Sequence, residues 1–363
     1  MNDIETDLFA ATGRPDAQLH PQFLALRDSP LLAPARDMLR DLHVLCHQES
    51  RDFQDYFQTS GFDTAMCDIY LLAMFRDAGH TVDVSRHSPN FLLRRDGIVV
   101  AVEATTALDA GSRRRVLSTR IPHDVSIGSG GALIRKLLQA PWRSPSVADK
   151  PLVMAIHDLH RGEASGNKLP MALLHFLFGS RHHDYVDFES HLEIHGSAAQ
   201  SREIDCMFPA GFFAQPGAEN IAAVLLCSDG AMVSKFNRMG QEGAHHSDAV
   251  RILRHGRCRP HHRAAGSATC FAYEVGSRGA EHECWNEGTL LVHNPRAIHP
   301  LPRNWLGASA EVDLRDGHLV ATFLRDFHPF TSVTETLTGT TPGWWVEARK
   351  ARLARDLLDH SSR

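Results

Sequence analysis

Hydrophobic and polar positions between residues 62 and 157 alternate with periods that predict a series of regular elements. A helix is expected from Asp63, its N-cap, to Ala78, because apolar residues recur at helical spacing and Gly79 follows as a stop signal. The elements after it are a strand over 81–85, a hairpin over 90–105, a helix over 132–139 and a buried strand over 151–157. The order helix, strand, hairpin, helix, strand predicts an α/β sandwich module.

The hairpin is the most specific of these predictions, because Asp96-Gly97 forms a two-residue turn. Both residue types accept the positive φ that a type I′ turn requires. Counting pairs outward from this turn places Asn90 opposite Glu103, and period-two alternation puts Thr105 on the face of Glu103. An acid within an otherwise apolar strand needs a partner or a cation, so Glu103 is the leading candidate for chemistry.

The flanking segments show weaker patterns. A second hairpin is expected from strands at 221–227 and 231–236 around Asp229-Gly230, extending the sheet. The other expected features are a short buried helix over 171–178, irregular structure over 241–310, two strands around Asp316-Gly317 and an amphipathic helix over 344–360. Three parts result: a helical segment 1–60, the α/β core 61–160 and a β-rich, partly irregular extension 161–363.

Composition places the chain among ordinary globular proteins. Of its 363 residues, 43% are hydrophobic and 22% are charged. A net charge of −5 argues against a protein that coats nucleic acid nonspecifically, although a local basic groove is compatible with it.

The location of the protein is predicted from three features of the sequence. No basic region followed by an apolar stretch marks a signal peptide at the start of the chain, and no apolar run is long enough to span a membrane. The seven cysteines are scattered and odd in number, which favours thiols over a disulfide framework. We therefore expect a cytoplasmic protein with no membrane association.

The first helix contributes a second acid. Asp68 lies among apolar residues, so its carboxylate is expected to point toward a core or a cleft, where it needs a partner, a metal or a shared proton. Asp68, Asn90 and Glu103 would then converge where the helix crosses the open end of the hairpin.

Each candidate residue also has a purely structural interpretation. Glu103 could pair with an arginine such as Arg113, and Asn90 could be a turn residue. Asp68 could be a partly exposed helix acid, and Lys136 a solvated helix lysine. The pattern alone leaves these alternatives open.

This arrangement resembles the PD-(D/E)XK nuclease-like superfamily over residues 62–157. Pro89-Asn90 resembles its Pro-Asp, and Glu103-Ala104-Thr105 resembles its Glu-x-Lys. Asp68 stands where many members carry a helical acid. The resemblance implies a restriction-endonuclease-like core.

In an active member of this superfamily, two acids bind Mg²⁺, and a lysine orients or deprotonates the attacking water. The resemblance therefore implies Asp68, Asn90 and Glu103 as metal ligands. Two positions depart from the pattern, since Asn90 supplies an oxygen without a negative charge and Thr105 replaces the lysine. Lys136, on the next helix, is our hypothesis for the missing ammonium, which requires it to lie toward the sheet. Either Thr105 or Lys136 would then serve the nucleophile.

Two functional hypotheses follow. The first is a Mg²⁺-dependent phosphodiesterase, a hydrolase that acts on nucleic acid. The alternative is a catalytically inactive nuclease-fold protein that binds or scaffolds, because Asn90 and Thr105 lack the charges of the pattern. A second resemblance, carried among other segments by 58–63, 235–240 and 293–295, is to a bacterial family often labelled "glycosaminoglycan attachment site". This second resemblance implies no activity.

Other groups of polar residues carry weaker signals. A cysteine and histidine cluster suits zinc by ligand type but lacks paired knuckle spacing, so zinc is disfavoured; it comprises Cys258, His261, His262, Cys270, His282 and Cys284. The arginines at 113–115 and the glycine-rich stretch 128–131 are expected in loops beside the cleft. Lys235 is expected as a charge at a strand edge.

Overall fold

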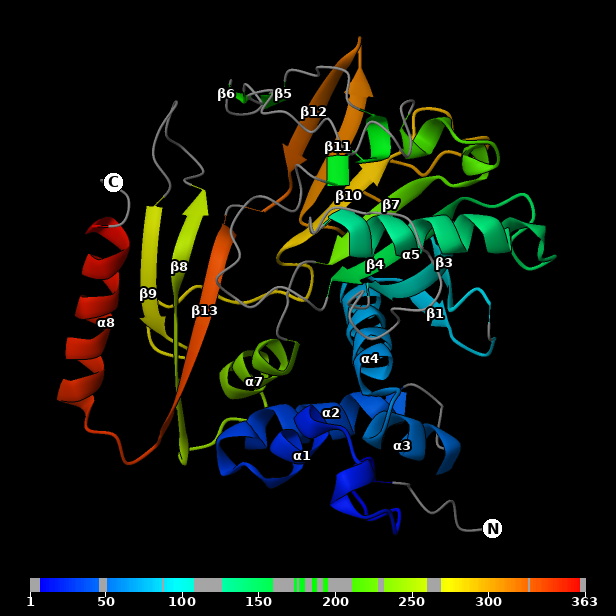
Figure 1. The fold of residues 1–363 in the computed structure, drawn as a ribbon. Coiled ribbons are helices and arrows are strands. Elements are labelled where there is room, and N and C mark those ends of the chain that lie inside the picture. Colours follow the sequence, from blue (N-terminus) through cyan, green and yellow to red (C-terminus); the bar gives the residue numbers. More distant parts are fainter. Residues whose placement is uncertain are drawn as a thin grey trace.

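The chain folds into a mixed α/β structure with two β-sheets, seen in a computed structural model (Figure 1). The structure describes residues 7–45, 51–86, 88–107, 126–158, 173–174, 176–179, 185–187, 192–194, 211–227, 232–259, 269–325 and 327–359. The arginines at 113–115 lie outside these ranges.

The elements are labelled as in Figure 1. The helices are α1 (Pro21–Asp28), α2 (Ala33–Leu45), α3 (Arg51–Gln58), α4 (Phe62–Asp77), α5 (Ser126–Gln139), α7 (Met232–Glu242) and α8 (Gly343–Asp359). The strands are β1 (Thr81–Asp83), β2 (Phe91–Arg95), β3 (Ile98–Ala107), β4 (Leu152–Asp158), β5 (Tyr185–Asp187), β6 (Leu192–Ile194), β7 (Ala223–Cys227), β8 (Val250–Arg259), β9 (Thr269–Glu274), β10 (Thr289–His293), β11 (Ala310–Arg315), β12 (His318–Phe323) and β13 (His328–Thr338).

The larger sheet has the strand order β1-β2-β3-β4-β7-β10-β11-β12-β5-β6, and the smaller sheet has the order β13-β8-β9. Strands β3, β4 and β7 are parallel neighbours, so their carboxyl ends lie at one edge of the sheet. The succession α4, β1, β2–β3, α5, β4 confirms the element order predicted from the hydrophobic pattern. Strand β7 then extends the sheet with residues beyond 160.

The hairpin of β2 and β3 has the register that its turn predicts. Asp96 and Gly97 have φ angles of 52° and 76°, the left-handed values of a type I′ turn. Phe91, the first residue of β2, lies opposite Val102. Strand β3 continues beyond this pair, so Glu103 comes level with the segment that precedes β2.

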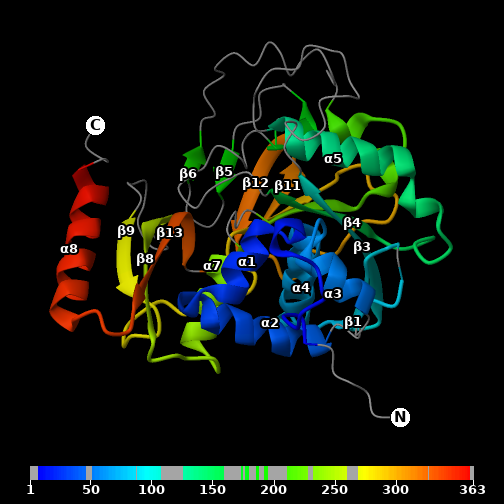
Figure 2. The same ribbon diagram turned by 60° about the horizontal axis from the view of Figure 1, so that its bottom comes forward.

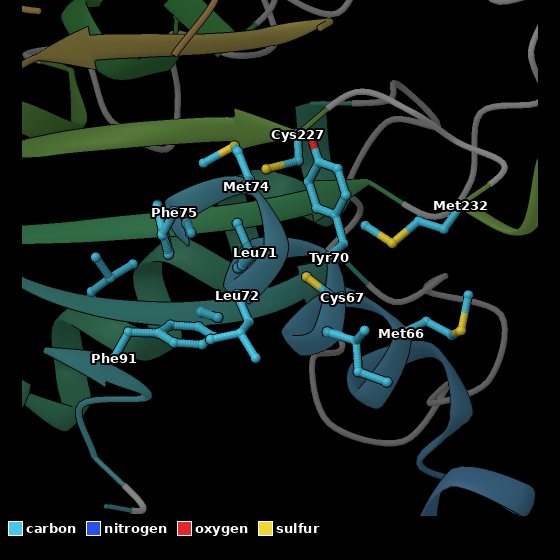
Figure 3. Packing of buried hydrophobic residues seen from close by; sticks show 14 of the residues in the cluster. Met66, Cys67, Tyr70, Leu71, Leu72, Met74, Phe75, Phe91, Cys227 and Met232 are labelled. Carbon is cyan, nitrogen blue, oxygen red and sulfur yellow. The ribbon is translucent and has the colours of Figure 1, made fainter. Parts of the chain in front are cut away.

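Two helices cover opposite faces of the central strands. Helix α4 packs on the face that carries Val102, and Figure 3 shows Leu71 and Phe75 of α4 within this core. Helix α5 packs through Leu133 on the other face, against Met154 of β4. Nearly the whole apolar run of α4 is buried, as expected for a helix that is apolar on most of its circumference and has other elements packed around it.

Two predicted boundaries in this region are wrong. Gly61 is the residue before α4, so Asp63 lies in the first turn of the helix instead of capping it. Helix α5 begins at Ser126, and the stretch 128–131, expected in a loop, is helical. Gly130 lies so near the ring of Phe176 that an added Cβ would be 3.0 Å from it, so this glycine serves packing.

The second predicted hairpin is also wrong, because residues 232–236 belong to helix α7. Asp229-Gly230 lies outside the described residues. Helix α7 buries polar side chains alongside apolar ones, namely Lys235, Asn237, Arg238 and Gln241. The hairpin was predicted from Asp229-Gly230 as its turn, although Met232, Phe236 and Met239 recur at helical spacing. The expectation of irregular structure over 241–310 fails as well, since β8, β9 and β10 lie there.

Several predictions outside the core are confirmed. Asp316-Gly317 joins β11 to β12, and α8 occupies the predicted C-terminal segment. Residues 173–174 and 176–178 are helical, as expected. Figure 2 shows the N-terminal helices α1, α2 and α3 gathered beside α4. Across the described ranges, no helix combines the length and apolar character needed to cross a bilayer.

Candidate functional site

The site lies at the open end of the hairpin, where β3 runs past the start of β2. Asn90 tethers the preceding segment to β3, because its Oδ1 accepts a hydrogen bond of 2.9 Å from the backbone N–H of Ala104. This bond holds residues 88–90 beside Glu103. Asn90 therefore has a structural role, because the oxygen that the resemblance implies as a metal ligand accepts a backbone hydrogen bond.

Glu103 is the centre of the site and is only 4% exposed. Lys136 of α5 donates from Nζ to Oε1 of this carboxylate. Ser88 donates from its hydroxyl to Oε2 at 3.1 Å. Each carboxylate oxygen thus has its own donor, one charged and one neutral, which compensates for the burial of the negative charge.

Asp68 brings a second carboxyl group to the site from α4. Its Oδ1 is buried and has no hydrogen-bond partner in the structure. The pKa of Asp68 is raised to about 7. Burial is the largest cause and the charge of Glu103 adds to the rise, whereas the ammonium of Lys136 lowers this pKa. Asp68, Glu103 and Lys136 are therefore close enough for their charges to interact.

Side chains from helices on opposite faces of the sheet interact with Glu103. Asp68 belongs to α4, which packs on one face of the central strands, while Lys136 belongs to α5 on the other. Both act on Glu103 at the place where β3 extends beyond β2. Because β3 extends past β2, Glu103 interacts both with Asp68 of α4 and with Lys136 of α5.

The structure thus brings together most of the residues that the sequence singles out. Lys136 lies toward the sheet, as it must if it supplies the ammonium that Thr105 lacks. Thr105 is half-buried and lies opposite Ile156 of β4, on the face of Glu103. Arg113, the alternative partner of Glu103, lies outside the described residues.

Ser88 is the site residue that sequence reasoning missed. Its signal was weak, because a serine two positions before a predicted strand is an ordinary loop residue. The hairpin register, which brings 88–90 level with Glu103, is the one signal that could have identified this position.

The oxygen donors of the site suit a hard cation. Asp68 and Glu103 offer carboxylate oxygens, and Mg²⁺ binds proteins through one or two carboxylates while keeping several waters. The buried, unpartnered Oδ1 of Asp68 adds a donor with no competing protein contact. Asp68 and Glu103 are therefore the residues of this site whose chemistry would suit a divalent cation.

Among the residues that the structure describes, no group of three or more His, Cys, Asp or Glu side chains is arranged to hold a metal ion. Of the residues considered for zinc, His261 and His262 lie outside the described ranges. Cys258 donates to the carbonyl of Thr269 across the β8–β9 ladder, so it forms part of the smaller sheet.

Comparisons of the chain with protein-family models, with curated proteins and with solved structures gave no match.

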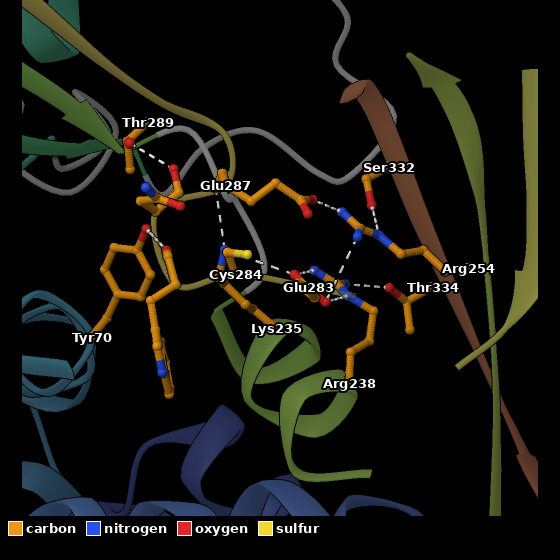
Figure 4. Close-up of polar contacts among 12 residues, drawn as sticks. Tyr70, Lys235, Arg238, Arg254, Glu283, Cys284, Glu287, Thr289, Ser332 and Thr334 are labelled. Carbon is orange, nitrogen blue, oxygen red and sulfur yellow. Dashed lines mark hydrogen bonds and ion pairs between the residues drawn. The ribbon is translucent and has the colours of Figure 1, made fainter. Parts of the chain in front are cut away.

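A second group of buried charges lies between α7 and the smaller sheet (Figure 4). Arg238 of α7 holds Glu283 through two hydrogen bonds of 2.7 and 2.8 Å. Arg254 of β8 pairs with Glu287, and Lys235 donates to the backbone carbonyl of Glu287 at 3.2 Å. The prediction of Lys235 as a strand-edge charge is wrong, because it is fully buried on a helix.

This ionic cluster, formed by Lys235, Arg238, Arg254, Glu283 and Glu287, is anchored to the smaller sheet. Arg238 donates to the hydroxyl of Thr334 and Arg254 to that of Ser332, both on β13. Burial raises the pKa of Glu283, but the charges of Arg238 and Arg254 outweigh burial and hold that pKa well below its ordinary range. The ionic cluster therefore joins α7 to the smaller sheet through charged contacts.

Proposed function

We propose that this protein is a divalent-metal-dependent phosphodiesterase that acts on nucleic acid, built on a restriction-endonuclease-like core. The succession of α4, hairpin, α5 and β4 supports this reading, as does the position of Glu103 on β3 beyond its pair with β2. Asp68 adds the helical acid of the resemblance.

The observation that carries the proposal is the contact between Lys136 and Glu103. Thr105 cannot supply an ammonium from β3, and this departure weakens the sequence motif. Lys136 supplies the ammonium from α5 instead, beside the acid that the motif requires. Two acids and one lysine then interact with one another, a set of groups that suits metal-assisted phosphodiester hydrolysis.

Each residue has a definite task in this proposal. Asp68 and Glu103 would hold the cation, which when bound supplies Lewis-acid activation and neutralises phosphate charge. Lys136 would orient the attacking water and stabilise negative charge on the phosphate oxygens. Asn90 keeps the segment before β2 in place through Ala104, so that Glu103 keeps its orientation.

The test is cleavage of plasmid and of single-stranded DNA and RNA in the presence of Mg²⁺ or Mn²⁺. We expect Glu103→Gln to lower the rate by at least about 100-fold, because it removes a charged ligand from the site. Glu347→Gln, at an exposed position on α8, is the matched control and should cleave like the unmodified protein. Equal rates for Glu103→Gln and the unmodified protein would rule out the assigned site.

The alternative is a binding protein that keeps the fold without catalysis. The specific observation in its favour is that Asn90 accepts a backbone hydrogen bond, so the position of the motif's first acid has a structural task. This alternative predicts that the protein retains nucleic acid in a filter-binding assay while no metal produces cleavage. Cleavage that depends on Glu103 excludes it.

A further inference from the structure

The two oxygens of Glu103 have partners of different kinds. Oε1 receives the ammonium of Lys136, a long side chain that is 20% exposed at the end of α5. Oε2 receives the neutral hydroxyl of Ser88, which precedes β2. The segment of Ser88 is tethered to β3 by the Asn90–Ala104 hydrogen bond, whereas Lys136 reaches the site through a flexible chain of methylenes.

The charges at the site do not balance when both acids are ionised. Asp68 and Glu103 carry two negative charges, and Lys136 offers one positive charge to them. Oδ1 of Asp68 is buried and has no hydrogen-bond partner, so a cation at this oxygen would compensate for the burial of an ionised carboxylate. A divalent cation would complete the balance, but it would compete with the ammonium for Glu103, since like charges repel strongly in a buried site.

We propose a division of roles at Glu103: Lys136 is an exchangeable counter-cation on Oε1, and Ser88 is a positioning residue that retains Oε2 throughout. Were Asp68 and Glu103 to hold a divalent cation, the ammonium of Lys136 would leave the carboxylate and become available to the phosphate or the attacking water. This inference rests on the proposed function, because it assumes that Asp68 and Glu103 bind a metal.

Ser88 suits the permanent role for a physical reason. A hydroxyl is a neutral donor, so it stabilises the carboxylate whether an ammonium or a metal ion neutralises the other oxygen. Its backbone position is held by the hairpin register. The carboxylate thus keeps one fixed hydrogen bond while its cationic partner changes.

The test is titration of the full-length protein with Mn²⁺ by isothermal calorimetry, without nucleic acid. Lys136→Met should bind Mn²⁺ about tenfold more tightly than the unmodified protein, because the competing ammonium is gone. Lys136→Arg keeps a positive charge and should not show this gain. Should Lys136→Met fail to fold by near-ultraviolet circular dichroism, Lys136→Gln takes its place.

The Ser88 arm uses the same measurement. Ser88→Ala should weaken Mn²⁺ binding about fivefold, and Ser88→Thr should restore it, because threonine keeps the hydroxyl donor. A purely structural effect of the substitution would lower thermal stability without this rescue of metal affinity by threonine.

The outcomes separate this inference from the proposed function. Unchanged or weaker Mn²⁺ binding by Lys136→Met overturns the exchange of cations, and unchanged binding by Ser88→Ala overturns the positioning role. Absence of Mn²⁺ binding in every variant overturns both the inference and the metal site on which it rests. Tighter binding by Lys136→Met in a protein that cleaves no nucleic acid supports the exchange while rejecting the phosphodiesterase.

Discussion

At the scale of single residues, Asp68 is the carboxyl group of the site whose burial is compensated least by hydrogen bonds. Its Oδ1 is buried without a hydrogen-bond partner, on a helix whose neighbouring side chains are almost all apolar. An ionised carboxylate in such surroundings destabilises the folded state unless a cation compensates for it. Functional sites often retain groups of this kind at the expense of stability.

The pKa of Asp68 gives a pH-dependent prediction. In the folded protein this pKa is raised to about 7, mainly by burial, from an ordinary value of 3.8. The folded state therefore binds the proton more tightly than the unfolded state, and stability falls as pH rises from about 4 to about 7. Asp68→Asn removes this loss, so its stability relative to the unmodified protein should improve by on the order of 3 kcal/mol between pH 4 and pH 8.

Urea unfolding at these two pH values, with a chelator to remove metal ions, measures this change. The comparison is between the two pH values, which cancels any cost of burying the amide itself. A stability difference that does not vary with pH would show that Asp68 titrates normally.

At the scale of elements, the sequence predicts those whose signals are local. The turn of the hairpin is set by Asp96-Gly97, because these two residues reach the required φ values, and the register follows from it. Helix α7 shows the opposite case, since its buried face includes Lys235 and Arg238. Their partners come from distant segments, so no local pattern marks this face as buried.

The crossing of α2 and α7 gives a prediction at this scale. An added Cβ on Gly240 of α7 would lie 2.4 Å from the backbone carbonyl oxygen of Pro34, so the two helices would have to separate. Gly240→Ala should therefore destabilise the protein by about 2 kcal/mol or more. Gly131→Ala on α5 is the control, because nothing lies within 4 Å of its added Cβ, and it should stabilise by up to about 1 kcal/mol.

Thermal or denaturant unfolding of the two glycine variants tests the crossing. Opposite signs of the stability change are expected. A neutral Gly240→Ala variant would mean that the contact between α2 and α7 yields at little cost.

At the scale of the whole molecule, the ionic cluster joins α7 and the segment before β10 to the smaller sheet. Helix α8 packs on that sheet as well, and Figure 1 shows it on the outer side of β9 and β8. Charged pairs inside a protein stabilise it weakly in net terms, but removing one partner is costly, because the other is left buried and unpaired.

Arg238→Met tests the ionic cluster. We expect it to destabilise the protein by about 3–5 kcal/mol, because Glu283 would lose its bidentate partner in a fully buried position. Arg349→Met, which removes the partly exposed pair with Glu335, is the matched control and should cost less than about 1 kcal/mol. Denaturant unfolding of both variants at neutral pH gives the comparison, and equal effects would contradict the assigned role of the ionic cluster.

Acidification provides an independent check on the same group. The pKa of Glu283 is held below its ordinary range in the folded state, so its contribution to stability is present above the unfolded value and is lost as pH falls below it. Stability should therefore decline below about pH 4.5, and this decline should be smaller in Arg238→Met.

The candidate site was predictable to the extent that local rules govern it. Asp68 and Glu103 stand out because each is an acid within an apolar run, and the turn register places Asn90 beside β3. The sequence offered Lys136 only as a hypothesis for the missing ammonium. Its contact with Glu103 depends on how α5 packs against the sheet, which no local pattern specifies.

The sequence by itself determined the order of helix, strand, hairpin, helix and strand, because periodicity and turn chemistry act over a few neighbouring residues. Tertiary structure alone decided which donors reach Glu103, since Ser88 and Lys136 are 15 and 33 positions away from it in the chain. It also decided the ionic cluster, in which Arg238 and Glu283 are separated by 45 positions. Side chains so far apart meet only when the sheets and helices have packed, because a polar group shows no sign in the sequence of the partner that will make its burial favourable.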